Sequence, residues 1–129
     1  MGIYLLDKAY RQSGSTAIPA ARVVVATAGP GECTLPASAN AGFILGIAMT
    51  GQSAPGRALT VRKAGVASAM AAGAIPYGAP VNIAGSTGKV KAISEAPGTK
   101  VQCLGFAETS AASDGDLVEV FVSIHERTA

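Results

Sequence analysis

Short apolar runs, separated by turns rich in glycine and proline, occupy the chain from residue 22 onward. The runs are four to eight residues long and recur about every ten residues, a spacing typical of a β-barrel or β-sandwich. The alanine-rich segment 64–74 is read as a strand, because its larger side chains alternate with alanines. We therefore predict an all-β protein with strands at 22–27, 32–35, 43–49, 58–63, 66–71, 80–84, 89–93, 101–108 and 117–124.

Alternation within two of these runs predicts which face of each strand is buried. Leu59 and Val61 share one face, and the valines of 118–122 share the matching face later in the chain. We expect these side chains in the core. The opposite face of the later run carries Leu117 and Phe121, which predicts subunit packing there. A second interpretation places Phe121 under the N-terminal segment.

The second half of the chain repeats the first. Residues 45–61 and 104–120 align without a gap at an offset of 59, and six of the seventeen positions are identical. We interpret this as two duplicated units of about 58 residues, 22–65 and 80–124, within a single β domain at 21–129. A duplicated unit of this kind favours a scaffold protein over an enzyme with a catalytic pocket.

Residues 1–20 lie outside both units and differ in character from the rest. We predict an extended N-terminal arm that packs on a partner or on the flank of the barrel, since a free tail rarely keeps such apolar groups. A frayed terminus is the other interpretation. The candidates for contact are Tyr4, Leu5, Leu6, Tyr10 and Arg11.

Composition and charge exclude several classes of function. The ten basic and eight acidic residues are scattered without a basic run, which disfavours nucleic acid as a partner. No apolar stretch is long enough for a spanning helix, and the N-terminus lacks the pattern of a secretory signal, so no membrane partner is expected. Cys33 and Cys103 align with aliphatic residues of the other unit, which predicts two reduced core thiols in a protein made in the cytoplasm.

Catalytic and cofactor-binding patterns are weak. The one histidine, His125, lies four residues from the C-terminus, and one histidine with two distant cysteines has no zinc-ligand spacing. The segment 51–58 has the glycine spacing of a phosphate-binding loop, but Arg57 and Ala58 replace its lysine and its serine or threonine. A strand, not a helix, is expected after it. We therefore predict no enzyme activity, no cofactor, no metal and no small-molecule substrate.

The order of small motifs along the chain resembles the capsid decoration proteins of tailed phages and prophages, often called capsid cement proteins. The motif Gly-[Ile/Phe]-Ala-x-Thr opens a strand twice, at 46–50 and 105–109. Gly65-Val66 follows the first such strand, Pro80-Val81 precedes the hairpin at 88–90, and the ending 115–120 is similar to the C-terminal strand of that family. The resemblance covers residues 15–124.

This resemblance implies a non-enzymatic virion component that binds the exterior of the mature capsid. Such proteins commonly form homotrimers at three-fold positions, where they bridge capsomers of the major capsid protein. Synthesis in the host cytoplasm is expected. The alternative is a carbohydrate- or host-surface-binding β-module, which the lack of tryptophan disfavours. A hydrolase or nucleotide-dependent enzyme is disfavoured by the absence of a catalytic constellation.

Overall fold

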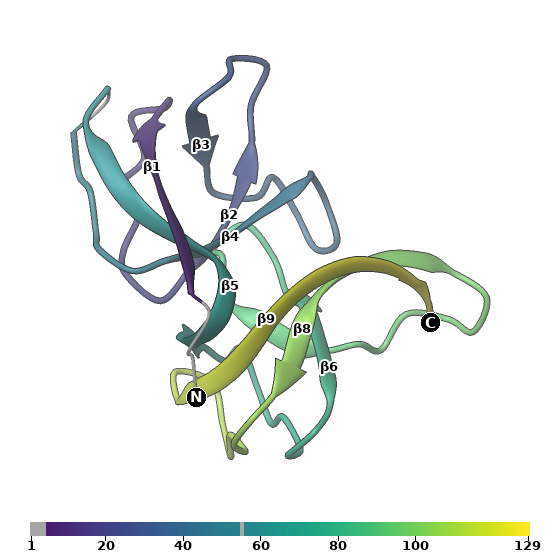
Figure 1. Ribbon diagram of the computed structural model, residues 1–129. Helices are drawn as coiled ribbons and strands as arrows, with labels where there is room; N and C mark the ends of the chain where they lie inside the picture. The colour runs from purple at the N-terminus through teal and green to yellow at the C-terminus, as the bar shows by residue number, and fades with distance from the viewer. Residues whose placement is uncertain (1–4, 55) are drawn as a thin grey trace.

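In the computed structural model, which describes residues 5–54 and 56–129, the chain is all-β (Figure 1), as predicted. No helix occurs among the described residues. The strands are β1 (Leu6–Gln12), β2 (Val23–Ala26), β3 (Glu32–Thr34), β4 (Ile44–Ala48), β5 (Ala58–Met70), β6 (Pro80–Ile83), β7 (Val90–Ala92), β8 (Lys100–Ala107) and β9 (Leu117–Thr128).

Eight of these strands lie where the apolar runs predict them. The structure differs at 58–71, where two predicted strands form the single strand β5. Gly65, which suggests a break in the sequence, has φ of 102° and lies inside this strand. Because glycine adopts positive φ without strain, the strand bends here and continues.

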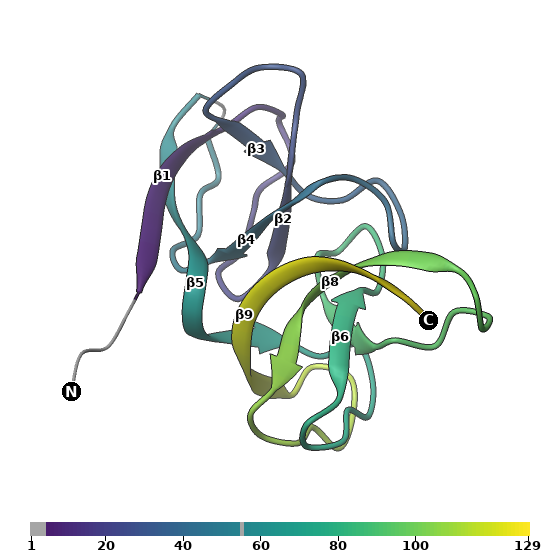
Figure 2. The ribbon, with the colours of Figure 1, turned by 45° about the vertical axis from the view of Figure 1, so that its right-hand side comes forward.

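The strands form two barrels that share β5 (Figures 1 and 2). The first barrel follows the order β1-β3-β2-β4-β5 and closes through pairing of β1 with β5. The second follows β5-β9-β8-β6-β7 and closes through one parallel bridge between Ala71 and Val90. Figure 2 shows β5 passing from the upper barrel into the lower one.

The prediction of a separate arm is wrong over Leu6–Gln12. This segment is β1, which pairs along β5 from Leu6 opposite Ala64 to Arg11 opposite Ala58. At its end Gln12 is 1% exposed, and its side-chain amide donates hydrogen bonds to the carbonyls of Gly14 and Thr16 in the following turn. The hydrophobic pattern missed this strand because one of its two buried residues is polar.

The predicted core faces are confirmed. Leu59, Val61, Val118, Val120 and Val122 are all at most 2% exposed. Their clusters are distinct: Leu59 and Val61 fill the first barrel, and the three valines belong to the second.

The two cysteines are free and fully buried, in agreement with the prediction of core thiols. Cys33 lies in the first barrel, and burial raises the pKa of its thiol to about 11. Burial also raises the pKa of the Cys103 thiol, which lies in the middle of β8. Both thiols are therefore held in the neutral, unreactive form.

Contacts in the two barrels recur at the offset of 59 found in the sequence. The hydroxyl of Thr50 accepts a hydrogen bond from the Thr60 amide at 3.1 Å, and the hydroxyl of Thr109 accepts one from the Glu119 amide at 3.0 Å. The pairing of β1 with β5 in the first barrel corresponds to that of β5 with β9 in the second. In the first barrel, β1 therefore pairs with the first half of β5 in the way that the second half of β5 pairs with β9 in the second barrel.

Candidate interaction surface

The residues predicted to contact the capsid fall into two groups. Leu5 and Leu6 are 50% and 55% exposed at the start of β1, and Arg11 is exposed near its end. These three side chains are available to a partner. Tyr4 lies outside the described residues.

Tyr10 does not share this surface, which corrects its place among the predicted contacts. Its side chain is 6% exposed and packs in the core of the first barrel. The Lys63 ammonium donates a hydrogen bond of 2.8 Å to its hydroxyl, and the Lys8 ammonium lies 5.2 Å from the ring centroid. Tyr10 faces inward because the side chains of a strand alternate and Gln12, two residues away, is also buried.

Leu117 and Phe121, predicted for subunit packing, lie on the outer face of β9. They are 58% and 46% exposed and are separated on this face by Glu119. The interpretation that Phe121 is covered by the N-terminal segment does not hold for the described residues, since the ring is nearly half exposed.

Phe121 is the centre of an apolar row that crosses neighbouring strands. It pairs with Val66 of β5 on one side and with Phe106 of β8 on the other, and Phe106 in turn pairs with Pro80 of β6. Val66 and Phe106 are each 39% exposed. We call Val66, Phe121 and Phe106 the outer row.

Phe106 is a surface residue that sequence reasoning missed. The repeat aligns it with Ile47, which is fully buried in the structure, whereas Phe106 is 39% exposed. Its ring stacks on the His125 ring at a centroid distance of 5.8 Å, and the Arg127 guanidinium lies 5.8 Å from it. The sequence carries no local signal for this exposure, because the pairing of Phe106 with Phe121 depends on the register of β8 against β9.

The first barrel carries different chemistry at the positions equivalent to the outer row. Arg62 corresponds to Phe121, and Asp7 corresponds to Val66. Arg62 binds both carboxylate oxygens of Asp7, at 2.8 and 3.0 Å. The hydrogen bond from Arg62 lowers the pKa of Asp7. The first barrel therefore has an ion pair at the positions where the second barrel has the exposed apolar side chains of Phe121 and Val66.

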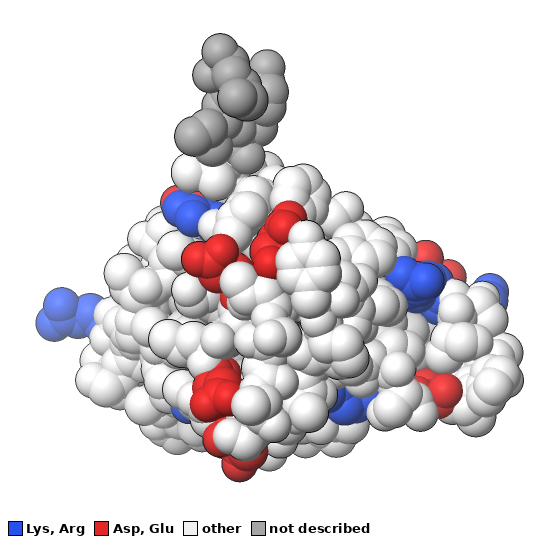
Figure 3. Space-filling view, turned by 90° about the horizontal axis from the view of Figure 1, so that it is seen from below, with Lys and Arg blue, Asp and Glu red and all other residues white. Residues whose placement is uncertain are grey.

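Charge is also divided between the barrels. Residues 1–64 contain six Lys and Arg against two Asp and Glu, whereas residues 65–129 contain four against six. In the view from below, which faces the second barrel, acidic side chains lie in the middle of the surface and basic ones mainly toward its edges (Figure 3). The first barrel is basic and the second is acidic.

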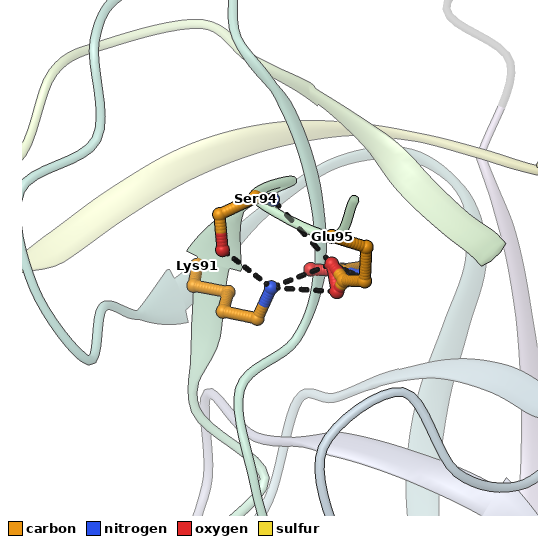
Figure 4. A network of polar contacts seen from close by, with 4 residues as sticks. Lys91, Ser94 and Glu95 are labelled. Carbon is orange, nitrogen blue, oxygen red and sulfur yellow. Dashed lines mark hydrogen bonds and ion pairs between the residues drawn. The ribbon is translucent and has the colours of Figure 1, made fainter. Parts of the chain in front are cut away.

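One polar cluster anchors the segment after β7 to the second barrel (Figure 4). The Glu95 carboxylate accepts hydrogen bonds from the Lys91 ammonium at 2.7 Å and from the Asn82 amide at 2.9 Å. Asn82 is fully buried. Burial alone raises the pKa of Glu95, but the hydrogen bonds from Lys91 and Asn82 together outweigh it, and the pKa is lowered. We assign this cluster a structural role, since the Glu95 carboxylate accepts hydrogen bonds from side chains of both β6 and β7.

We expect Glu95→Gln to destabilise the fold by about 1–2 kcal/mol at pH 7, because it removes the charged acceptor of the buried Asn82 amide and of the Lys91 ammonium. The pKa of Glu95 is lower in the folded chain than in the unfolded one. Its contribution is therefore present above the unfolded pKa of about 4.3 and is lost as the pH falls through the folded pKa. Urea unfolding at pH 7 and at low pH measures both effects.

Glu108→Gln, at an exposed carboxylate of the same barrel, is the matched control for this experiment. It should leave the unfolding free energy at pH 7 within about 0.5 kcal/mol of the wild type. A Glu95→Gln deficit that stays equally large once the pH is below the folded pKa of Glu95 would contradict the assignment, because a protonated Glu95 carries no charge to lose.

The structure offers little for small-molecule chemistry in the part of the chain that it describes. A shallow hollow of about 350 Å³ is lined by residues 17–19 and 51–53, none of which is titratable. Ala58 opens strand β5, so the glycine-spaced segment before it leads into a strand, as predicted. Within residues 5–54 and 56–129, no three His, Cys, Asp or Glu side chains are grouped as metal ligands would be. Over the same residues, no helix could cross a membrane.

Comparison with known proteins agrees with this all-β architecture. The sequence profile of the phage cement protein family matches residues 8–124. The chain is similar to a solved structure described as the N base of the head fiber gp8.5 of bacteriophage phi29, with a TM-score of 0.63 and 18% identity. That match covers 93% of this chain and 95% of the other, and at this identity it shows a shared fold. No curated protein matches the sequence.

Proposed function

This chain belongs to the phage cement protein family, and on that premise we propose that it binds the exterior of the mature capsid as a homotrimer. In this role it bridges neighbouring capsomers at three-fold positions and performs no catalysis. The observation that supports this most directly is the exposed apolar surface on this all-β fold. Leu5, Leu6, Leu117 and the outer row are more than a third exposed, which is typical of interaction sites.

Mass action explains how such binding stabilises a capsid. A protein that binds the lattice of the expanded capsid, and does not bind other forms of the capsid, shifts the equilibrium toward the expanded form. Three copies held together bind multivalently, so that each weak contact benefits from the effective concentration that the others supply. Rigid barrels suit this purpose because little conformational entropy is lost on binding.

We propose that the major capsid protein is contacted by the start of β1. Leu5 and Leu6 are exposed there, and Arg11 lies farther along the same strand. Over Leu6–Ala9, β1 pairs with β5 on one edge, while its pairing with β3 involves only Arg11 and Gln12. An extended segment with an unpaired edge is suited to strand addition by a partner.

Binding to mature, undecorated heads tests the proposal. Purified protein is mixed with heads, the heads are sedimented, and the bound protein is measured against its free concentration. We expect Leu5→Asp with Leu6→Asp to weaken binding by at least about tenfold, because two apolar contacts are replaced by charges. Since both side chains are exposed, the variant should unfold at the wild-type urea concentration.

Phe43→Asp is the matched control, since Phe43 is 62% exposed and lies outside the start of β1. It should bind heads as the wild type does. A wild-type chain that fails to sediment with heads would refute the proposal. Binding to a glycan array under the same conditions would instead favour the carbohydrate-binding alternative.

A further inference from the structure

We propose that the outer row of the second barrel is the docking surface for the first barrel of another copy, in a head-to-tail contact. This inference rests on the proposed function and specifies the subunit contact within it. Three observations carry it: the apolar character of the row, the covering of the equivalent face inside the chain, and the opposite charges of the two barrels.

The three apolar side chains of the row are adjacent, and polar groups border its two ends: His125 and Arg127 at Phe106, and Arg62 at Val66. Val66, Phe121 and Phe106 occupy paired positions on adjacent strands, so their side chains lie next to one another on one face of the sheet. They are 39%, 46% and 39% exposed. Two phenyl rings and a valine in one row are the kind of aromatic anchor that dominates protein interfaces.

Part of the same face of the first barrel, at the positions of Ile47 and Val23, is covered by the second barrel, whereas Arg62 and Asp7 on that face are not buried. Ile47, the equivalent of Phe106, is fully buried in a cluster that contains Val118 and Val120 of the second barrel. Val23, the equivalent of Pro80, is buried in the same cluster. Within one chain, this face of a barrel therefore serves as a barrel–barrel interface. The second barrel presents its equivalent face uncovered.

Charge selects the first barrel of a second copy as the occupant. The outer row belongs to the acidic barrel, and Glu119 lies between Leu117 and Phe121 on the same face. The basic groups beside the row are Arg127, 5.8 Å from the Phe106 ring, and Arg62, which donates a hydrogen bond to the Val66 carbonyl, so the excess of acidic residues is a property of the whole second barrel. The first barrel has an excess of basic residues, and Lys8 and Arg57 are exposed on it. Packing unlike barrels together brings opposite charges into contact, whereas packing two second barrels would bring like charges together. A head-to-tail contact of this kind closes into a ring when its rotation allows.

Sedimentation equilibrium of the full chain tests the contact. We expect the wild type to associate, and Phe106→Ser with Phe121→Ser to weaken association by at least about tenfold. Phe121→Ser alone is a milder second variant with the same expected direction. Raising the salt from about 0.05 to about 0.5 M should weaken the wild-type association, since exposed charges are screened. Phe43→Ser, at an exposed aromatic before β4, is the matched control and should keep the wild-type mass.

Mixing two variants tests the head-to-tail arrangement. Lys8→Glu with Arg57→Glu alters the first barrel and leaves the outer row intact, while the Phe106 and Phe121 variant does the reverse. Each variant alone should be monomeric. Their mixture should form a heterodimer, because one intact outer row then meets one intact first barrel. Circular dichroism and urea unfolding establish that both variants are folded.

Four results would overturn the proposal. These are a wild-type chain that is monomeric up to about 1 mM, a row variant that keeps the wild-type mass, a first-barrel variant that associates normally, and a mixture that stays monomeric. A wild-type chain that is monomeric but sediments with heads would refute this inference and leave the proposed function standing. If the row variant then failed to bind heads, the occupant of the row would be the capsid protein.

Discussion

Gly105→Ala is expected to destabilise the fold by about 3 kcal/mol or more, enough to leave much of the chain unfolded or insoluble. Gly105 lies inside β8 with φ of 156°, at the point where the register against β9 shifts. A Cβ atom built there would overlap the carbonyl oxygen of Phe121 in the adjacent strand. Because that oxygen belongs to the backbone of a central strand, it cannot move aside without breaking the sheet. Urea unfolding of the purified variant, or its soluble yield, measures the effect.

Gly85→Ala is the matched control for this substitution. A Cβ atom at Gly85 would have nothing within 4 Å, and its φ is not in the positive range. Its unfolding free energy should stay within about 0.5 kcal/mol of the wild type. Gly46 has φ of 152° and would clash in the same way with the Arg62 carbonyl, so Gly46→Ala should behave like Gly105→Ala. A Gly105→Ala chain as stable as the Gly85→Ala chain would show that β8 relaxes around the new methyl group.

Ile47→Ala should destabilise the fold much more than Phe106→Ala, although the repeat aligns the two positions. Ile47 is fully buried between the barrels, and its truncation should cost about 2–5 kcal/mol of unfolding free energy. Phe106 is 39% exposed on the outside of the sheet, so its truncation should cost only about 1 kcal/mol. Urea unfolding of the two variants, at a concentration where the wild type is monomeric, gives the comparison.

Phe106→Ala serves as the control for Ile47→Ala, since both remove a large apolar side chain from equivalent strands. Equal losses of stability at the two positions would mean that Phe106 is packed within the monomer. That result would remove the ground for treating the outer row as a free surface.

The positions of the strands could be predicted well because apolar runs and turn glycines are local signals. Eight strands lie where those signals indicate, and the alternation in 117–122 correctly separates Val118 and Val120 from Leu117 and Phe121. β1 was missed for a reason that is also local. Its inward face combines Tyr10 with Gln12, and a buried glutamine is visible only through the carbonyls that its amide contacts.

The candidate surface could be predicted only in part. The exposure of Leu117 and Phe121 can be predicted from alternation along one strand. The contact surface at the start of β1 can be predicted from the leucines near the N-terminus. Phe106 and Val66 join the surface through strand pairing, which the order of residues does not specify. Likewise, Tyr10 and Leu6 lie on one short segment, yet one is buried and the other exposed, because only the inner end of β1 is enclosed by the barrel.

The sequence by itself determined the all-β class, the turns, the core faces of the long strands, the repeat and the family resemblance, because each depends on residues close together or on the order of motifs. Only the tertiary structure decided that β1 completes a barrel, that Ile47 is buried and Phe106 exposed at equivalent positions, and that an apolar row crosses β5, β9 and β8. The physical reason is that burial at these positions depends on what covers a sheet from outside. The second barrel covers the first at Ile47, and among residues 5–54 and 56–129 no third barrel covers the second.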